Sequence, residues 1–335
     1  MESNKVMKLE EGKIYFFICY ALVCGGKSTF FEQIQSQTNS GDNNNKYNVK
    51  MVSSDQIRAD LSHEMQKKNP SMTFKHDKLG KQTATEFDKQ IQKAIESKED
   101  NKINIILVDK NYPQGIDKFL KSFCKDKSSQ FFVVFIPNIT KPLEIGNLWF
   151  PFSLNYFIQC YLRLKNRHGH EVLNGEDEEA KLVYISFFKL FQNFDFFKNI
   201  KGNNPYEDKK NYKKENDDST PKRFERSRDK YQNKNKNKNL NFDKNIFIQK
   251  IDFTDETKDM EIDEDTKKFF NDVISKMKAF DMKDLKENYQ KDIENYFKII
   301  DEKYDGKNFF EDTRENIKKQ VDNFLNDGIS DLEKK

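Results

Sequence analysis

The sequence has few features of a disulfide-rich, zinc-binding or membrane-spanning protein. Its four cysteines, Cys19, Cys24, Cys124 and Cys160, form no CxxC pair and have no companion histidine spacing, which argues against a disulfide framework and a zinc site. We expect reduced intracellular thiols. The apolar run 14–23 is too short to cross a bilayer and leads into Gly-Lys-Ser rather than a cleavage site. We therefore expect a soluble cytoplasmic or nuclear protein with no membrane partner.

Neither the net charge nor the apolar content is high. The 335 residues carry a formal net charge of +3, so the overall charge does not by itself indicate a nucleic-acid partner. Only 35% of the residues are hydrophobic and the mean hydropathy is −0.95, so part of the chain must lie outside a packed core. Aromatic residues nevertheless reach 13%, with 31 Phe. Because each buried ring removes much apolar surface from water, a core built from few residues is enough to stabilise a globular domain.

Short apolar segments alternate with segments of helical spacing in the first half of the chain. The apolar segments are rich in β-branched and aromatic residues, as is typical of strands covered on both faces of a parallel sheet. They are 14–19, 104–108 and 131–136, with 49–52 as a candidate fourth. Helical spacing is found over 29–37 and 83–97. Strands that alternate with helices predict a doubly wound α/β domain.

The rest of the chain divides by composition into further parts. Two helical segments, 154–165 and 178–191, occupy the place of a lid and complete a core that we assign to residues 1–200. Segment 201–245 has 14 Lys and Arg against 8 Asp and Glu, with many Asn, which predicts a disordered insertion. Its aromatic residues among lysines would allow weak RNA contact, although a solvated low-complexity loop is the simpler interpretation.

Regular secondary structure is expected again after the insertion. The pattern IFIQKIDF, residues 246–253, predicts a strand, and 266–280 has helical spacing. We assign 246–280 to the last strand and helix of the core. Residues 281–335 are amphipathic and predict a helical C-terminal extension.

A phosphate-binding pattern follows the first apolar segment directly. The string ALVCGGKST, residues 21–29, fits G-x-x-x-x-G-K-[ST] except that Ala21 occupies the first glycine. In such a loop the backbone N–H groups and the helix N-terminus face phosphate oxygens. Lys27 would reach the β- and γ-phosphates and the Ser28 hydroxyl would coordinate Mg²⁺. The predicted nucleotide-binding residues are Ala21, Gly25, Gly26, Lys27, Ser28 and Thr29. An ordinary strand-to-helix turn is the alternative.

The segment MVSSDQIRADL suggests a general base and an anion anchor. Asp55 follows a short strand, where its carboxylate could accept the proton of an attacking hydroxyl. Arg58, three residues later, could bind an acceptor phosphate bidentately, through two of its guanidinium N–H groups. The alternative is that Asp55 is only a helix N-cap and Arg58 a solvated side chain.

Asp109 ends the apolar run 104–108, a position from which an acidic residue beside a phosphate loop can bind Mg²⁺ through water. We assign Ser28 and Asp109 to the metal, and Asn111, two residues later, to the acceptor. In the string RLKNRHGH, Arg163 and Arg167 are four residues apart, so both guanidinium groups can face one anion. They would stabilise charge on the transferred phosphoryl group, unless they form only a basic surface turn.

These motifs, in this order, resemble those of the P-loop polynucleotide 5′-kinases, and more closely the kinase domain of fungal-type tRNA ligases. The family loop reads roughly A-x-x-G-C-G-K-T-T, which makes Ala21 a family feature. VSSDQIR resembles the strand-Asp segment, ILVDKNYPQ the V-D-x-N-x-x-Q segment, and WFPFSLNYFIQCYLRLKNRHGHEVL the helix that leads to the lid arginines. The resemblance covers about residues 10–195 and, less clearly, 246–280.

The resemblance implies a P-loop NTPase fold and a polynucleotide 5′-hydroxyl kinase that transfers the γ-phosphate of ATP or GTP, with Mg²⁺, to a 5′-OH RNA end. The RNA would be a cleaved tRNA exon in splicing, or a repair substrate. Catalysis is assigned to Lys27, Asp55, Arg163 and Arg167. No Lys-x-x-Gly ligase motif stands upstream of the loop, and no pair of H-x-T/S motifs is present, so we expect a ligase to be a separate partner. The alternatives are a kinase of a small-molecule acceptor and an inactive nucleotide-dependent binding module.

Overall fold

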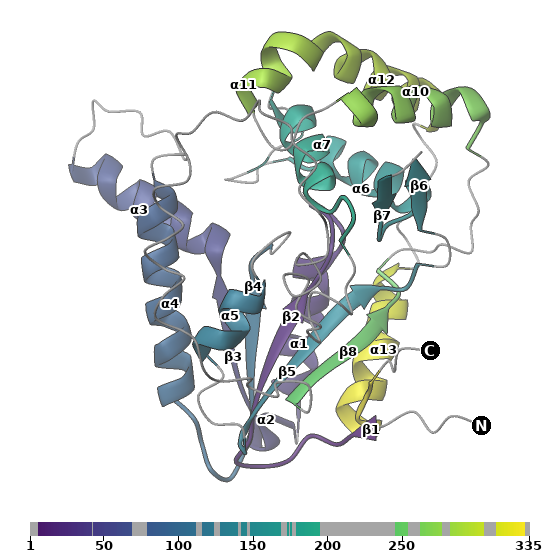
Figure 1. The fold of residues 1–335 in the computed structure, drawn as a ribbon. Coiled ribbons are helices and arrows are strands. Elements are labelled where there is room, and N and C mark those ends of the chain that lie inside the picture. The colour runs from purple at the N-terminus through teal and green to yellow at the C-terminus, as the bar shows by residue number, and fades with distance from the viewer. Residues whose placement is uncertain are drawn as a thin grey trace, which may run out of the picture.

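The structure is a computed structural model of the chain (Figure 1). It describes residues 6–41, 43–68, 79–111, 116–123, 128–139, 142–145, 148–168, 173, 175, 179–194, 245–253, 262–276, 282–304 and 313–331. Cys124 and, except for its last residue, the predicted insertion 201–245 lie outside the described residues.

A five-stranded parallel sheet forms the centre of the molecule. Its strands are β2 (Ile14–Cys19), β3 (Tyr47–Ser53), β4 (Ile103–Asp109), β5 (Gln130–Pro137) and β8 (Ile246–Ile251). They lie in the order β3-β4-β2-β5-β8 and all pairs are parallel. Every residue of β2 and β4 is buried, as continuous apolar runs require in a sheet covered on both faces. The predicted α/β class with a mostly parallel sheet is confirmed.

Helices cover both faces of this sheet (Figure 1). On one face lie α1 (Lys27–Thr38) and α13 (Thr313–Asp327), and on the other α4 (Gly80–Glu96) and α5 (Ile116–Phe123). Neighbouring side chains of β2 point to opposite faces. Phe16 therefore meets Phe119 of α5 edge to face, whereas Phe17 meets Phe324 of α13 in the same way. The C-terminal helix α13 thus completes the core beneath the sheet.

A second layer of helices lies beyond the carboxyl ends of the strands. It contains α6 (Leu154–Lys165), α7 (Ala180–Leu190), α10 (Glu264–Lys276) and α12 (Gln290–Tyr304). Phe157 of α6 packs against Phe188 of α7, Phe270 of α10 and Phe297 of α12. Helices distant in sequence therefore share one aromatic core.

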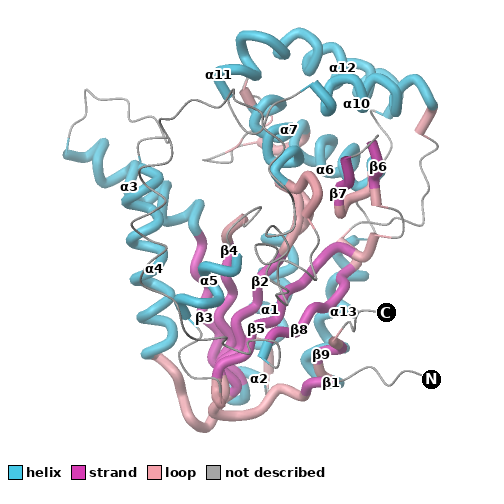
Figure 2. Tube along the Cα trace, viewed as in Figure 1, coloured by secondary structure: helices cyan, strands magenta, loops and turns pink. Residues whose placement is uncertain are grey.

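Helix α3 and several short elements make up the rest of the described secondary structure (Figure 2). Helix α3 (Ser54–Lys68) follows β3 and packs on α4. The remaining elements are α2 (Asn43–Lys46), α11 (Met282–Asp284), the π-helical turn η5 (Leu285–Tyr289), β6 (Leu143–Ile145), β7 (Leu148–Phe150), β1 (Val6–Met7) and β9 (Ile329–Ser330). Strands β1 and β9 pair antiparallel. No helix in the described ranges is long and apolar enough to cross a membrane.

Candidate active site

The carboxyl ends of the central strands bring the predicted site residues to one edge of the sheet. In the register of β3 and β4, Ser53 pairs with Asp109, and Ile18 of β2 pairs with Val108. The loop after β2, the start of α3 and residues 109–111 therefore emerge side by side. The chain leaves β2 toward β3 on one side and leaves β5 toward β8 on the other. Such a reversal creates a crevice at the carboxyl ends, where α/β sheets bind ligands.

The loop between β2 and α1 has the backbone of a tight turn. Cys24 and Gly26 have positive φ values of 61° and 92°, and Gly26 is the N-cap of α1. The Gly25 N–H donates to the carbonyl oxygen of Leu22 at 2.9 Å. A Cβ at Gly25 would lie 3.2 Å from the Cβ of Ala21. Ala21 can therefore replace a glycine at the start of the loop because residue 25 has no side chain.

Lys27, which is half-buried, and Asp109, which is buried, form an ion pair at the end of the sheet. The Ser53 hydroxyl donates to the other carboxylate oxygen of Asp109 at 3.1 Å. Ser28, beside Lys27 in the first turn of α1, is exposed. Lys27, Ser28 and Asp109 therefore lie together at the N-terminus of a helix, where a phosphate anion is stabilised.

One face of α6 lies against this loop. Tyr156, Cys160 and Arg163 recur at the i, i+4 and i+7 positions of that face. The Tyr156 hydroxyl donates to the carbonyl oxygen of Gly25 at 3.4 Å, and burial raises the pKa of this hydroxyl well above its usual range. Tyr156 is therefore a neutral donor. The sequence prediction omitted it, although its spacing from Arg163 was visible.

Both predicted arginines reach the loop. Arg163 donates to the carbonyl oxygen of Phe253 at 3.1 Å, and its Nη1 lies 3.4 Å from the point where a Cβ on Gly26 would be. Arg167 lies just beyond the end of α6, and its Nη1 is 3.7 Å from the sulfur of Cys24. Burial raises the pKa of the Cys24 thiol, whereas Arg167, and less strongly Arg163 and Lys27, lower it. Three cations thus converge on the loop.

The opposite face of α6 is fixed by the helix α12. The Tyr161 hydroxyl donates to both carboxylate oxygens of Asp301 at 3.2 Å, and Lys165 forms an ion pair with Asp301 at 3.3 Å. The rings of Tyr161 and Phe297 stack with centroids 4.0 Å apart. Because two residues along a helix turn by about 200°, Arg163 points away from Asp301 and toward the loop. The predicted lid helix is therefore a packed wall of the site in this structure.

Asp55 and Arg58 lie on α3, at the side of the site formed by β3 and β4. Asp55 stands in the first turn of α3 and Arg58 one turn later, both half-buried. The residue before α3 is Ser53, and its hydroxyl accepts from the Gln56 N–H at 3.5 Å. The N-cap position therefore belongs to Ser53 and not to Asp55. Within the described part of the chain Asp55 forms no ion pair, and Lys27 is paired with Asp109 instead.

Lys110 is a further cation at this side that the sequence prediction omitted. Its ammonium lies over the ring of Phe87, 4.8 Å from the centroid. Burial lowers the pKa of Lys110, and the charge of Arg58 lowers it further, whereas Asp88 raises it. The Nε of Arg58 and the Oδ1 of Asn111 are buried and have no hydrogen-bond partner among the described residues. Lys110 follows Asp109 directly, so its position was available from the motif.

The residues present fit a magnesium ion shared with phosphates. The described ranges contain no group of three or more His, Cys, Asp and Glu side chains able to hold a metal by themselves. Mg²⁺ keeps several waters and needs only one or two protein oxygens beside the substrate phosphates. The carboxylate of Asp109 and the hydroxyl of Ser28 are suitable oxygens.

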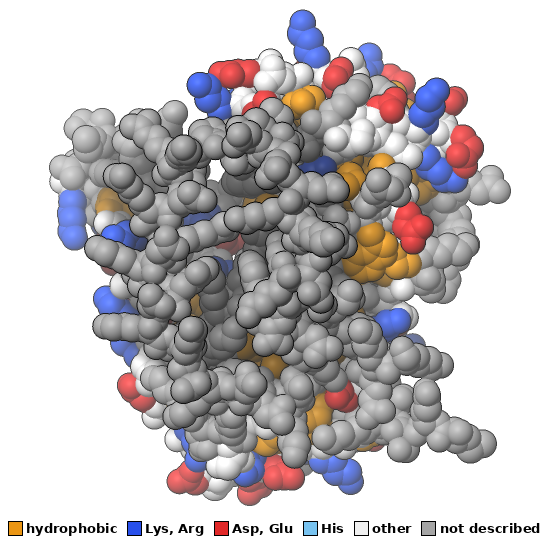
Figure 3. All heavy atoms as spheres, in the orientation of Figure 1, with side chains coloured by type: hydrophobic (Ala, Val, Ile, Leu, Met, Phe, Trp, Pro, Cys, Tyr) orange, Lys and Arg blue, Asp and Glu red, His pale blue; other side chains and the backbone are white. Residues whose placement is uncertain are grey.

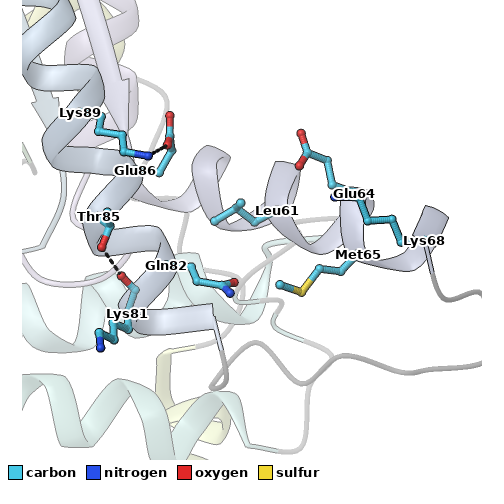
Figure 4. Close-up of a pocket in the computed structure, with 9 residues that line it drawn as sticks. All are labelled: Leu61, Glu64, Met65, Lys68, Lys81, Gln82, Thr85, Glu86 and Lys89. Atoms are coloured by element: carbon cyan, nitrogen blue, oxygen red, sulfur yellow. Dashed lines mark hydrogen bonds and ion pairs between the residues drawn. The ribbon is translucent and has the colours of Figure 1, made fainter.

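A pocket of about 400 Å³ lies elsewhere, between α3 and α4 (Figure 4). Leu61 and Met65 of α3 and Gln82 of α4 line it, and none of the predicted site residues does. On the face shown in Figure 3, the described Lys and Arg side chains lie among Asp and Glu side chains.

Comparison with known proteins does not supply a family, because neither a protein-family model nor a curated protein sequence matches the chain. The assignment of function therefore depends on the residues of the crevice and on their geometry.

Proposed function

We propose that the chain is a P-loop polynucleotide 5′-hydroxyl kinase that transfers the γ-phosphoryl group of ATP or GTP to a 5′-OH end of RNA. One observation supports this most: three separated segments, carrying Lys27, Asp55 and Asp109, emerge at a single edge of the sheet. Helix α6 brings Arg163 against the loop that precedes Lys27. The order of these segments is that of the kinase domain of tRNA ligases. A cleaved tRNA exon or a repair substrate, sealed by a separate RNA ligase, fits this proposal.

The donor nucleotide would bind between the phosphate loop and α6. The backbone of Gly25 and Gly26, with Lys27, forms the cradle on one side. Arg163 and Arg167 supply positive charge on the other side, where the transferred group accumulates charge in the transition state. Bound Mg²⁺, held through Ser28 and Asp109, would neutralise phosphate charge.

Asp55 would orient the 5′-hydroxyl and accept its proton. Its carboxylate has no ion-pair partner among the described residues, so it is available to a hydroxyl donor. The packing of α6 on α12 holds the arginines in place before substrate binds. Preorganised charges cost no rearrangement during the reaction, which is how such sites lower a barrier.

The test is transfer of labelled γ-phosphate from ATP or GTP to a 5′-OH oligoribonucleotide. Asp55→Asn should lower kcat by about 100-fold or more, the contribution typical of a general base, and should leave donor affinity unchanged. Asp60→Asn is the control, because Asp60 is exposed on the same helix. Undiminished transfer by Asp55→Asn would exclude the assigned mechanism.

The same assay separates the alternatives. A kinase of a small-molecule acceptor would phosphorylate nucleosides or metabolites and leave oligonucleotides unlabelled. A binding module would bind nucleotide and label no acceptor.

A further inference from the structure

One face of α3 leads from the crevice into the pocket between α3 and α4. Residues three or four positions apart form a single stripe on a helix. The members of this stripe are Arg58, Leu61, Met65 and Lys68, of which the last three line the pocket. Measured from Asp55 in the first turn, Leu61 lies about 9 Å and Lys68 about 20 Å farther along the helix axis. An extended ligand that reaches Asp55 along α3 therefore passes the pocket.

The α4 wall of the pocket also reaches the crevice. Glu86 lines the pocket, and the ammonium of Lys110 lies over the ring of the next residue, Phe87, 4.8 Å from its centroid. Lys110 follows Asp109, the last residue of β4. Both helices that form the pocket are therefore in contact with, or continuous with, the strand ends that carry the site.

The inner surface of the pocket combines apolar side chains with an amide. Leu61 and Met65 are half-buried, and Figure 4 shows Met65 and Gln82 pointing toward each other from the two helices. Apolar side chains can pack on the face of a nucleobase, and an amide can both donate to and accept from its edge. The volume of about 400 Å³ is within the range of small-ligand sites.

The charged residues around the pocket leave two cations for phosphates. The lining contains three lysines, Lys68, Lys81 and Lys89, and two acids, Glu64 and Glu86. Lys89 forms an ion pair with Glu86 at 3.5 Å. Lys68 and Lys81 are exposed and form no ion pair within the described ranges. One lies on each helix, so they can meet phosphates on the two sides of a bound nucleoside.

We propose that this pocket binds a nucleotide downstream of the 5′ end of a single-stranded RNA acceptor. Leu61 and Met65 contact its base. Lys68 and Lys81 contact the adjoining phosphates. Because a base must be unstacked to enter the pocket, a single strand is preferred to a duplex. This inference rests on the proposed function for the identity of the ligand and adds to it a subsite that favours longer acceptors.

The experiment measures equilibrium binding without a donor, so that it does not depend on turnover. A 5′-OH decaribonucleotide and a 5′-OH dinucleotide are titrated against the full chain by calorimetry at several salt concentrations. Lys68→Met and Lys81→Met each remove one charge from the pocket. Lys67→Met is the matched control, because Lys67 is exposed on the same helix and does not line the pocket. Thermal unfolding of each variant verifies that it is folded.

The decaribonucleotide should bind more tightly than the dinucleotide. Each pocket variant should weaken its binding by about 5-fold at roughly 0.1 M salt, and should reduce the slope of log K against log[salt] by about 0.7, the value for one phosphate contact on a single strand. Binding of the dinucleotide should not change, and Lys67→Met should alter neither RNA. Equal affinity for the two RNAs, or the same loss in Lys67→Met as in Lys68→Met, would overturn the inference. Undiminished binding of the decaribonucleotide by both pocket variants would also overturn it and would leave a protein segment as the candidate occupant.

A photocrosslink locates the bound strand. Decaribonucleotides that carry 4-thiouridine at one position each are irradiated with the chain, and mass spectrometry identifies the linked peptide. Internal positions should link to residues 61–68 or 81–89, and the 5′-terminal position should not. Links from internal positions only to other parts of the chain would contradict the proposed path of the acceptor.

The outcome is distinguishable from a failure of the proposed function. If the chain transfers no phosphate to any acceptor, yet RNA links to the pocket and the pocket variants reduce the salt slope, the kinase proposal fails and the RNA pocket stands. If transfer to 5′-OH RNA occurs and the pocket variants keep the same KM for the decaribonucleotide, the kinase proposal stands and this inference fails.

Discussion

The hydroxyl of Tyr156 donates a hydrogen bond to the carbonyl oxygen of Gly25, so the helix that carries Arg163 touches the backbone of the loop between β2 and α1. The contact is tight, because a Cβ on Gly25 would overlap that hydroxyl and lie 2.9 Å from the carbonyl oxygen of Leu22. The shapes of the loop and of α6 are therefore coupled.

Gly25→Ala should distort the loop and weaken binding of ATP by about 10-fold or more, since overpacking of a tight contact costs about 1–3 kcal/mol. Fluorescence titration with a labelled nucleotide measures this. Gly80→Ala is a matched control, because a Cβ there would meet no atom within 4 Å. Normal affinity in Gly25→Ala would show that the loop is not the nucleotide site.

Adding Tyr156→Phe to Gly25→Ala should restore part of the lost affinity. The phenyl ring lacks the oxygen that the new methyl group meets first, whereas the contact with Leu22 remains. The two changes should therefore be non-additive by about 0.5–3 kcal/mol in a double-mutant cycle. Additive effects would mean that α6 and the loop act independently.

Lys27→Met and Asp109→Asn should affect donor binding in opposite ways when Mg²⁺ is absent. Lys27→Met removes the cation of the phosphate site and should weaken binding of ATP by about 10-fold or more. Asp109→Asn removes the anion that competes with phosphate for Lys27, so metal-free binding should be retained or tightened. Isothermal titration with EDTA present gives both values. A loss of metal-free affinity in Asp109→Asn would contradict the arrangement.

Asp301→Asn should weaken the packing of α12 on α6, the helix that positions the two arginines. The neutral side chain loses the ion pair with Lys165 and weakens the bond from Tyr161, which should lower the free energy of unfolding by about 1 kcal/mol. The kcat for phosphoryl transfer should fall, although Asp301 touches α6 on the face away from the loop. Asp292→Asn, an exposed acid on the same helix, should change neither quantity. If Asp301→Asn lowers the free energy of unfolding but leaves kcat unchanged, α12 does not position the arginines of α6.

Cys24 should report on nucleotide binding through its reaction with a thiol reagent. Among the described cysteines it is partly exposed, whereas Cys19 and Cys160 are buried. Burial raises its pKa, so the thiolate fraction is small at neutral pH and alkylation should accelerate as the pH rises through and beyond 9. ATP should slow the alkylation by covering the loop, as followed by mass spectrometry with Cys24→Ser as control. Equal rates with and without ATP would place the nucleotide elsewhere.

Local patterns predicted many elements within a few residues. The apolar run 14–19 is β2, and 154–165, begun by Ser153 whose hydroxyl accepts from the Tyr156 N–H, is α6. A buried strand and a helix with a side-chain cap are both specified by neighbouring residues. Asp109, expected beside the loop from its place at the end of the run 104–108, forms an ion pair with Lys27.

The packing partners of helices that are distant in sequence could not be predicted from local patterns. Helical spacing over 281–335 indicated helices but not their partners, and the structure packs α13 on α1 and α12 on α7. Amphipathic faces specify that a helix is buried and leave open what covers it. Lys110 and Tyr156 were missed for a related reason, because their significance arises from Arg58 and Gly25, which are distant in sequence.

Val6 pairs with Ser330 and Met7 with Ile329, so the two ends of the described chain lie side by side, near α13 and away from α6 and α7 (Figure 1). Neighbouring ends are the usual condition for circular permutation and domain insertion. A reporter protein or a surface tether joined at either of these ends would therefore lie on the side of the molecule away from α6 and α7.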